Sequence, residues 1–137
     1  MSHLLKKSHV NIDSAQLLLD NDFYSSSVHC SYYSSYQILK YAISYNEGVS
    51  YEQFDEERKN IMNEKKKYVG SHEFYIDNKF FNLLIREKVN LRNLNKLNQL
   101  KTFRSKSDYE NIEITENDSK KAINLSKEVI QLINKFI

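Results

Sequence analysis

The chain has no proline and only two glycines, Gly48 and Gly70, among its 137 residues. These are the residue types that most often end helices or form turns, so we expect long uninterrupted helices. The scarcity of glycine also excludes several kinds of site. A phosphate-binding loop, a dinucleotide-binding turn and the nucleophile elbow of a serine hydrolase each need glycines at fixed spacings, and the sequence has none of these spacings.

Cysteine and metal-ligand patterns are equally scarce. Cys30 is the only cysteine, which excludes a disulfide within the chain and a cysteine-rich metal site. The histidines are His3, His9, His29 and His72. No two of them lie four residues apart, the spacing that brings two ligands to one face of a helix. We therefore expect neither a metal ion nor another cofactor.

Long hydrophobic runs and a strong charge of one sign are also missing. Residues 1–7 hold no apolar stretch long enough for a signal peptide, and no segment is apolar enough to span a bilayer. We expect a cytoplasmic protein without membrane association. The 20 lysines and arginines and 18 acidic residues leave a net charge of +2. This balance by itself does not indicate a nucleic-acid-binding surface.

What the sequence does contain is helical periodicity over most of its length. We expect helices over residues 4–20, 23–46, 50–67, 71–85, 90–111 and 115–136, from their apolar side chains or, in residues 50–67, from the order of the charges. Ten tyrosines and seven phenylalanines can supply a large buried area. We expect one all-α domain over residues 1–137. Its predicted architecture is an up-and-down antiparallel bundle of four long helices plus one or two shorter helices.

Residues 23–46 are the segment in which helix and strand are hardest to distinguish, because serine and tyrosine are frequent there. Strict alternation fails at the adjacent pair Tyr32-Tyr33. Steps of four and three residues are instead kept by Val28, Tyr32, Ser35, Leu39 and Ala42. This spacing predicts a helix. Its neighbouring face carries His29, Tyr33, Gln37 and Lys40.

The boundaries of three helices are predicted from charge and capping residues. Residues 50–67 begin with acids and end with lysines, which complements a helix dipole and favours a solvated helix over a lysine-rich RNA-binding patch. We expect Gly70 to end this helix and Ser71 to cap the next one. Thr115-Glu116-Asn117-Asp118 has the pattern of a capping box at the start of the last helix.

Arg104 is the most informative candidate for chemistry. It follows Leu97 and Leu100 at the next helical step, so it should lie near the packed seam of the bundle. Asp108, four residues later, lies on the same face. Two interpretations remain open. The first is an ion pair within the helix, in which Arg104 and Asp108 only neutralise each other. The second is an arginine held ready for a phosphate group, because the planar guanidinium can donate two parallel hydrogen bonds to phosphate oxygens. Spacing alone favours the structural pair.

Several motifs together resemble the HEPN (higher eukaryotes and prokaryotes nucleotide-binding) superfamily. Ser14-Ala15-Gln16-Leu17-Leu18-Leu19, an aromatic turn at Phe23-Tyr24, and Ser31-Tyr32-Tyr33-Ser34-Ser35-Tyr36-Gln37 are similar to its first two helices. Ser71-His72 with Phe80-Phe81 resembles its middle segment, and Phe103-Arg104-Ser105-Lys106-Ser107-Asp108-Tyr109 resembles its Arg-x-x-Ala-Asp-Tyr motif. The closing helix around Ala122 is similar too. The resemblance covers nearly the whole chain, most loosely over residues 48–69.

This resemblance implies a helical bundle that dimerises through the faces carrying the motifs. Many relatives are metal-independent ribonucleases of toxin–antitoxin, defence or RNA-processing systems, in which an arginine and a histidine four to six residues later act on an RNA phosphate. Others bind nucleotides or work beside a nucleotidyltransferase. The present chain departs from the nuclease pattern, since Tyr109 and Glu110 stand where that histidine is expected and Gln37 stands where relatives often have another.

Two functional hypotheses follow from the resemblance. The first is binding of RNA or nucleotide phosphate at a dimer cleft, with RNA cleavage as its catalytic form. Its catalytic candidates are Arg104, Asp108 and His72, and its substrate-binding candidates are Tyr33, Gln37, Tyr109 and His29. The second is a non-catalytic module that docks a nucleotidyltransferase or an antitoxin. A purely structural bundle, with Arg104 satisfied by Asp108, is the third interpretation.

Overall fold

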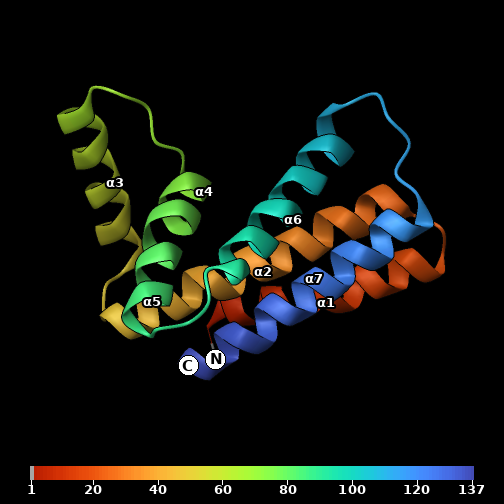
Figure 1. Ribbon diagram of the computed structural model, residues 1–137, viewed down its shortest axis with the longest axis horizontal. Coiled ribbons are helices and arrows are strands. Elements are labelled where there is room, and N and C mark those ends of the chain that lie inside the picture. Colours follow the sequence, from red (N-terminus) through yellow and green to blue (C-terminus); the bar gives the residue numbers. More distant parts are fainter. Residues whose placement is uncertain (1) are drawn as a thin grey trace.

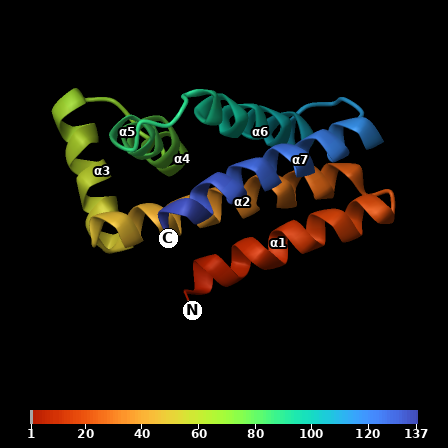
Figure 2. The ribbon, with the colours of Figure 1, turned by 60° about the horizontal axis from the view of Figure 1, so that its bottom comes forward.

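The computed structural model describes residues 2–137, and every regular element within them is a helix. The body consists of α1 (His3–Asp20), α2 (Tyr24–Glu47), α6 (Arg92–Tyr109) and α7 (Glu116–Ile133). Figures 1 and 2 show α2 in the middle, with α1 and α7 beside it and α6 above them. Helix α2 packs against the other three. The predicted all-α bundle is therefore confirmed, with α1 and α2 forming one antiparallel pair and α6 and α7 another.

The remaining helices form an arm beside this body. They are α3 (Tyr51–Lys65), α4 (Ser71–Glu73), the π-helical turn η1 (Phe74–Phe80) and α5 (Phe81–Arg86), and a 3-10 turn, η2 (Asn134–Phe136), follows α7. Figure 1 shows the arm rising from the carboxyl end of α2, opposite α6. A notch separates the arm from α6, and α2 runs beneath it.

The hydrophobic core lies where α2, α6, α7 and the arm meet. The stripe predicted on α2, from Val28 to Ala42, is fully buried at all five of its positions. Side chains from the other elements complete the core, among them Phe54, Phe74, Phe80, Leu84, Leu97, Leu100, Val129 and Ile133. Burial of large aromatic and aliphatic groups is the main stabilising contribution to such a domain.

Buried serines explain why a serine-rich segment forms a helix here. The Ser8 hydroxyl donates to the Ser34 carbonyl oxygen at 2.7 Å, and the Ser34 hydroxyl donates to the Ser8 carbonyl oxygen at 2.7 Å. The Ser27 hydroxyl donates to the carbonyl oxygen of Ala15 at 2.7 Å. These small side chains allow α1 and α2 to approach closely, and each finds an acceptor on the neighbouring helix. Packing between helices thus overrides the modest helix propensity of serine.

Two of the predicted helix boundaries are wrong and one is confirmed. Helix α3 ends at Lys65 and not at Gly70, because Lys66 takes a left-handed conformation, with φ 50°, and its N–H donates to the Met62 carbonyl oxygen. Ser71 is the first residue of α4 and not its cap, since Gly70 occupies the cap position without a side-chain hydrogen bond. The capping box at Thr115 is present as predicted, with Asp118 as its partner.

Membrane-spanning helices and metal-binding clusters are both absent from residues 2–137. Within these residues no helix combines the length and the apolar character needed to cross a membrane. The same residues hold no group of three or more histidine, cysteine or acidic side chains arranged to bind a metal ion.

Candidate phosphate-binding site

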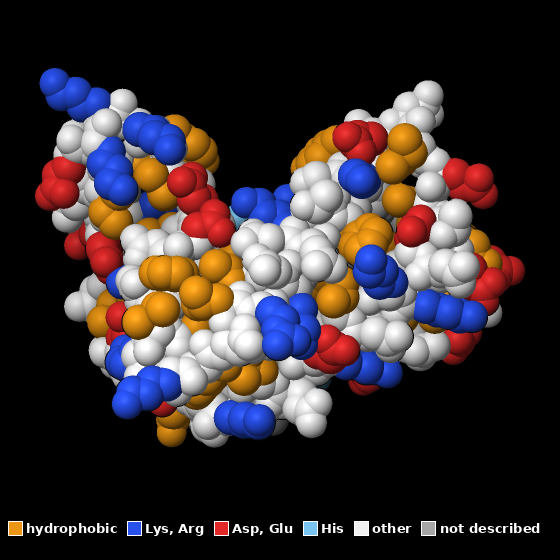
Figure 3. All heavy atoms as spheres, in the orientation of Figure 1, with side chains coloured by type: hydrophobic (Ala, Val, Ile, Leu, Met, Phe, Trp, Pro, Cys, Tyr) orange, Lys and Arg blue, Asp and Glu red, His pale blue; other side chains and the backbone are white. Residues whose placement is uncertain are grey.

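The candidate site joins three helices across the base of the notch. Figure 3 shows this notch as a hollow between the arm and α6, with blue lysine or arginine side chains and a small pale-blue area of histidine on its floor. The residues involved come from α2, from the start of α4 and from the carboxyl-terminal half of α6. We call His29, Tyr32, Tyr33, His72, Arg104, Asp108 and Tyr109 the Arg104 cluster.

Arg104 is held by aromatic rings and not by hydrogen bonds. Its guanidinium carbon lies 5.2 Å from the ring centre of Tyr32, 5.9 Å from that of Tyr33 and 5.8 Å from that of Tyr109. Its side chain is only 13% exposed. The Nε atom is buried, and no hydrogen-bond partner for it exists within residues 2–137. Cation–π attraction positions the charge without occupying its hydrogen-bond donors.

Asp108 is shared between Arg104 and a histidine from another helix. The distance from Arg104 Nη1 to Asp108 Oδ2 is 3.8 Å, which is too long for a hydrogen bond. Nδ1 of His29, on α2, lies 3.1 Å from the same carboxylate oxygen and 3.3 Å from the other. The nearer partner of Asp108 is therefore His29, and the ion pair within α6 does not fully satisfy Arg104. A donating Nδ1 leaves Nε2 of His29 free.

His72 is fixed by tyrosines from α2. Its ring stacks on that of Tyr36, with ring centres 4.2 Å apart and planes 3° apart, and its Nδ1 forms a hydrogen bond with the Tyr32 hydroxyl. Tyr32 is fully buried, so its proton would lack an acceptor unless the hydroxyl donates to Nδ1. That arrangement places the His72 proton on Nε2. The Tyr36 hydroxyl donates to Ser71 Oγ at 3.2 Å, which holds the start of α4 in place.

The electrostatics of the cluster favour a bound anion. Burial, followed by the charges of Arg104, Lys101 and Lys40, lowers the pKa of His72 to about 4, so His72 is neutral at pH 7. Burial likewise raises the pKa of the Tyr32 hydroxyl, which stays protonated. The neutral imidazole of His72 offers its Nε2–H as a donor, while the arginine and lysines offer positive charge. A phosphate group would match both properties.

Six of the seven residues predicted as site residues lie together. They are His29, Tyr33, His72, Arg104, Asp108 and Tyr109, joined by the contacts described above and by the packing of Tyr33 against both histidine rings, with ring centres 4.7 and 6.0 Å away. Gln37 is the exception, because its Oε1 accepts a hydrogen bond of 2.8 Å from Asn11 on α1. It lies in the contact between α1 and α2.

Sequence reasoning missed Tyr32 and Tyr36 as site residues, since both belong to the packed side of α2. The four-residue step between them, with Lys40 at the next step, was the available signal. Lys40 lies 5.0 Å from the ring centre of Tyr75 and 5.9 Å from that of Tyr36, and burial lowers its pKa. Lys40 and Arg104 are far apart in the sequence, so spacing could not indicate that both charges act on His72.

A hollow of about 550 Å³ opens beside His29 and Asp108. Its lining is formed by Ser25, Ser26, His29, Cys30, Ser107, Asp108 and Tyr109. The Ser107 hydroxyl donates to the Ser25 carbonyl oxygen at 2.9 Å and ties the end of α6 to the start of α2. Burial raises the pKa of the Cys30 thiol, which disfavours a reactive thiolate. The imidazole and carboxylate are the groups here that can transfer or hold a proton.

Comparison with known proteins gives one result. The family model described as the HEPN domain matches residues 1–136. No curated protein and no solved structure matches the chain.

Proposed function

The chain belongs to the HEPN domain family, and from that premise we propose that it binds RNA or a nucleotide through a phosphate group at Arg104, in a cleft completed by a second copy of the chain. The observation that carries this proposal is the state of Arg104. Its guanidinium is mostly buried, one of its nitrogens has no hydrogen-bond partner within residues 2–137, and its acidic neighbour lies 3.8 Å away. A guanidinium whose other nitrogens are not committed to a carboxylate can donate them to a bound phosphate.

The residues around Arg104 also support a catalytic form of this proposal, metal-independent cleavage of RNA in a toxin–antitoxin or defence system. In this reaction Nε2 of His29 accepts the proton of a ribose 2′-hydroxyl, while Asp108 orients the imidazole through Nδ1. The 2′-oxygen attacks phosphorus, and the 5′-oxygen leaves and takes a proton from water. Arg104 and the Nε2–H of His72 donate to the phosphate oxygens. His29 would thus replace, from α2, the histidine that is missing after Arg104.

Binding and cleavage are tested separately with matched variants. Arg104→Gln should abolish binding of uridine monophosphate, while Arg92→Gln, a change of the same type at an exposed position of α6, should leave binding intact. His29→Ala should abolish RNA cleavage in the presence of a chelator, and His9→Ala, on the exposed face of α1, should not. Equal nucleotide binding by the wild type and Arg104→Gln would refute the proposed site. Binding without cleavage would retain the site and remove the catalytic form.

A second candidate function, docking of a partner protein such as a nucleotidyltransferase or antitoxin, is favoured by exposed apolar side chains on the arm. Phe81 and Ile85 lie one helical turn apart on α5 and are 37% and 54% exposed, and Leu91 beyond them is 40% exposed. Two exposed apolar groups on neighbouring turns of one helix face are typical of an interface. If docking is the function, Ile85→Asp should abolish association with the protein encoded beside this chain, while Arg104→Gln should not change it.

A further inference from the structure

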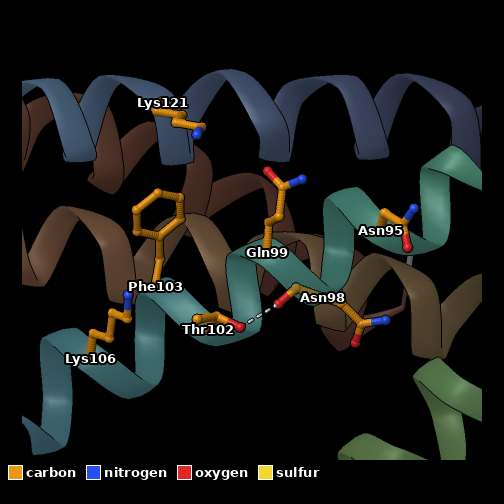
Figure 4. A pocket seen from close by; sticks show the side chains of 7 residues that line it. All are labelled: Asn95, Asn98, Gln99, Thr102, Phe103, Lys106 and Lys121. Atoms are coloured by element: carbon orange, nitrogen blue, oxygen red, sulfur yellow. Dashed lines mark hydrogen bonds between the residues drawn. The ribbon is translucent and has the colours of Figure 1, made fainter.

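The face of α6 turned away from Arg104 carries uncharged polar side chains in a regular series. Together with α7 it forms a hollow of about 470 Å³, lined by Asn95, Asn98, Gln99, Thr102, Phe103, Lys106 and Lys121. Figure 4 shows Gln99 and Phe103 rising from α6 toward α7, with Lys121 reaching from α7 toward the Phe103 ring. The lysine nitrogen lies 5.6 Å from the centre of that ring.

The amides of this hollow have no hydrogen-bond partners in the part of the chain that the structure describes. Across residues 2–137, no hydrogen bond engages the side-chain amides of Asn95, Asn98 or Gln99. The Thr102 hydroxyl donates backward to the Asn98 carbonyl oxygen at 3.0 Å, as Figure 4 also shows. Three amides with both donors and acceptors free, beside one partly exposed aromatic ring, can pair with base edges and ribose hydroxyls and offer a stacking surface.

A second hollow, of about 360 Å³, adjoins the first one on α6. Three residues, Asn98, Thr102 and Lys106, line both hollows, and the second one also includes Lys101 and Ser105. Lys101 precedes Arg104 by three residues on α6, and its charge reaches His72. The two hollows therefore adjoin and form one path on α6, in which Lys101 is the lining residue one helical turn before Arg104.

Positive charge runs along this path without acidic partners. Lys101, Lys106 and Lys121 take part in none of the ion pairs found within residues 2–137. Glu110, at the rim of the second hollow, is the one acid among the lining residues of the two hollows. Unpaired lysines spaced along a groove are suited to successive phosphates of a nucleic-acid strand.

We propose that the ligand of the Arg104 cluster is single-stranded RNA, which continues around α6 and places bases in the amide-lined hollow beside Phe103. This inference rests on the proposed phosphate binding at Arg104 and adds a base-binding subsite between the outer face of α6 and α7. A double helix is disfavoured, because a stiff A-form duplex cannot follow the curve of one α-helix from one face to the other. A protein partner is disfavoured because Phe103 is the only large apolar side chain in the lining of the two hollows, whereas interface cores need several.

The dependence of affinity on salt tests the path directly. The probe is an oligouridylate of about eight nucleotides with 2′-O-methyl riboses, which cannot be cleaved through the 2′-oxygen. Each phosphate contact on a single strand contributes about −0.7 to the slope of log affinity against log salt. Arg104 with three lysines should give a slope near −2.8, or about 50-fold weaker binding at 200 mM than at 50 mM salt. Combined Lys101→Ala, Lys106→Ala and Lys121→Ala should reduce this loss to about 3-fold.

Amide variants and matched controls complete the experiment. Asn98→Ala with Gln99→Ala should weaken oligouridylate binding without changing the salt slope, whereas Asn124→Ala on the exposed face of α7 should do neither. Lys127→Ala, also exposed on α7, should leave the slope unchanged. Circular dichroism establishes that each variant is folded.

The possible failures are distinguishable. If uridine monophosphate binds through Arg104 but the oligouridylate shows a slope near −0.7 and ignores the lysine and amide variants, the RNA path is wrong and the phosphate site stands. In that case the outer face of α6 would be a candidate surface for a different partner, such as a protein. If neither ligand binds, the proposed function fails together with the inference.

Discussion

The Tyr32 hydroxyl on α2 and Nδ1 of His72 on α4, 40 residues apart in the sequence, form a hydrogen bond beside Arg104. This contact ties the arm to the body of the molecule. It also decides which nitrogen of His72 carries the proton, because the buried phenol has no other acceptor for its hydrogen within residues 2–137. Nε2 then carries the proton and is left as a donor.

Replacing Tyr32 with phenylalanine should release His72 from this tautomer. We expect nitrogen NMR to detect a mixture of the two tautomers in Tyr32→Phe, and the free energy of unfolding to fall by about 1 kcal/mol. The matched control is Tyr36→Phe, whose lost hydroxyl donates to Ser71 and not to His72. A single unchanged tautomer in Tyr32→Phe would contradict the assignment.

His72 should make the protein less stable in mild acid. Its pKa is about 4 in the folded chain, against an ordinary value of 6.5. Between these pH values the unfolded chain binds a proton that the folded chain does not, so stability falls as the pH drops from about 6.5 to about 4. Because His72 is only half-buried, we expect less than about 0.7 kcal/mol per pH unit, half of the value for a fully shifted group.

Thermal unfolding measured across this pH range checks the prediction. The decline toward acid should be shallower in His72→Phe than in the wild type, and unchanged in His9→Gln, which alters an exposed histidine. Parallel curves for the wild type and His72→Phe would show that His72 titrates normally in the folded state.

Arg104 should contribute little to stability although it is mostly buried. We expect Arg104→Met to leave the free energy of unfolding within about 1 kcal/mol of the wild type, since the flexible apolar side chain can pack against the same tyrosine rings. The cation–π attraction that is lost is offset by removing a buried donor without a partner within residues 2–137. Nucleotide binding should nevertheless be lost. A stability loss of several kcal/mol would instead identify the arginine as a structural residue paired with Asp108.

The packed side of α2 should dominate stability. Leu39 is fully buried in the core, so Leu39→Ala should lower the free energy of unfolding by about 2–5 kcal/mol through lost burial and the cavity left behind. Leu17 on α1 is 64% exposed, and the same change there should cost under about 0.5 kcal/mol. Urea unfolding of the two variants provides the comparison, and similar costs at both positions would contradict this assignment of the core.

Local sequence was sufficient to predict the helices and the buried face of α2. The steps of four and three from Val28 to Ala42 select one side of a helix, and all five positions are buried. The capping box at Thr115 is likewise a local pattern, and it forms as predicted. The end of α3 was not predictable in the same way. Lys66 adopts a left-handed conformation that glycine would favour, so the residue type at this position carried no signal.

The candidate site was only partly predictable for a related reason. The position of Arg104 near the packed seam follows from its spacing to Leu97 and Leu100, which are both fully buried. Its partners come from other helices. His29 and Asp108 are 79 residues apart, and no spacing rule relates residues on helices whose packing is unknown.

The amino-acid sequence by itself determined a helical chain, its family and the arginine near its core, because periodicity, caps and motifs are properties of neighbouring residues. Only the tertiary structure decided that Asp108 lies nearer to His29 than to Arg104, that Tyr32 orients His72, and that Gln37 belongs to the contact with α1. The physical reason is that the way helices pack sets which side chains meet. That packing leaves Arg104 held by aromatic rings, with a buried nitrogen that has no partner within residues 2–137.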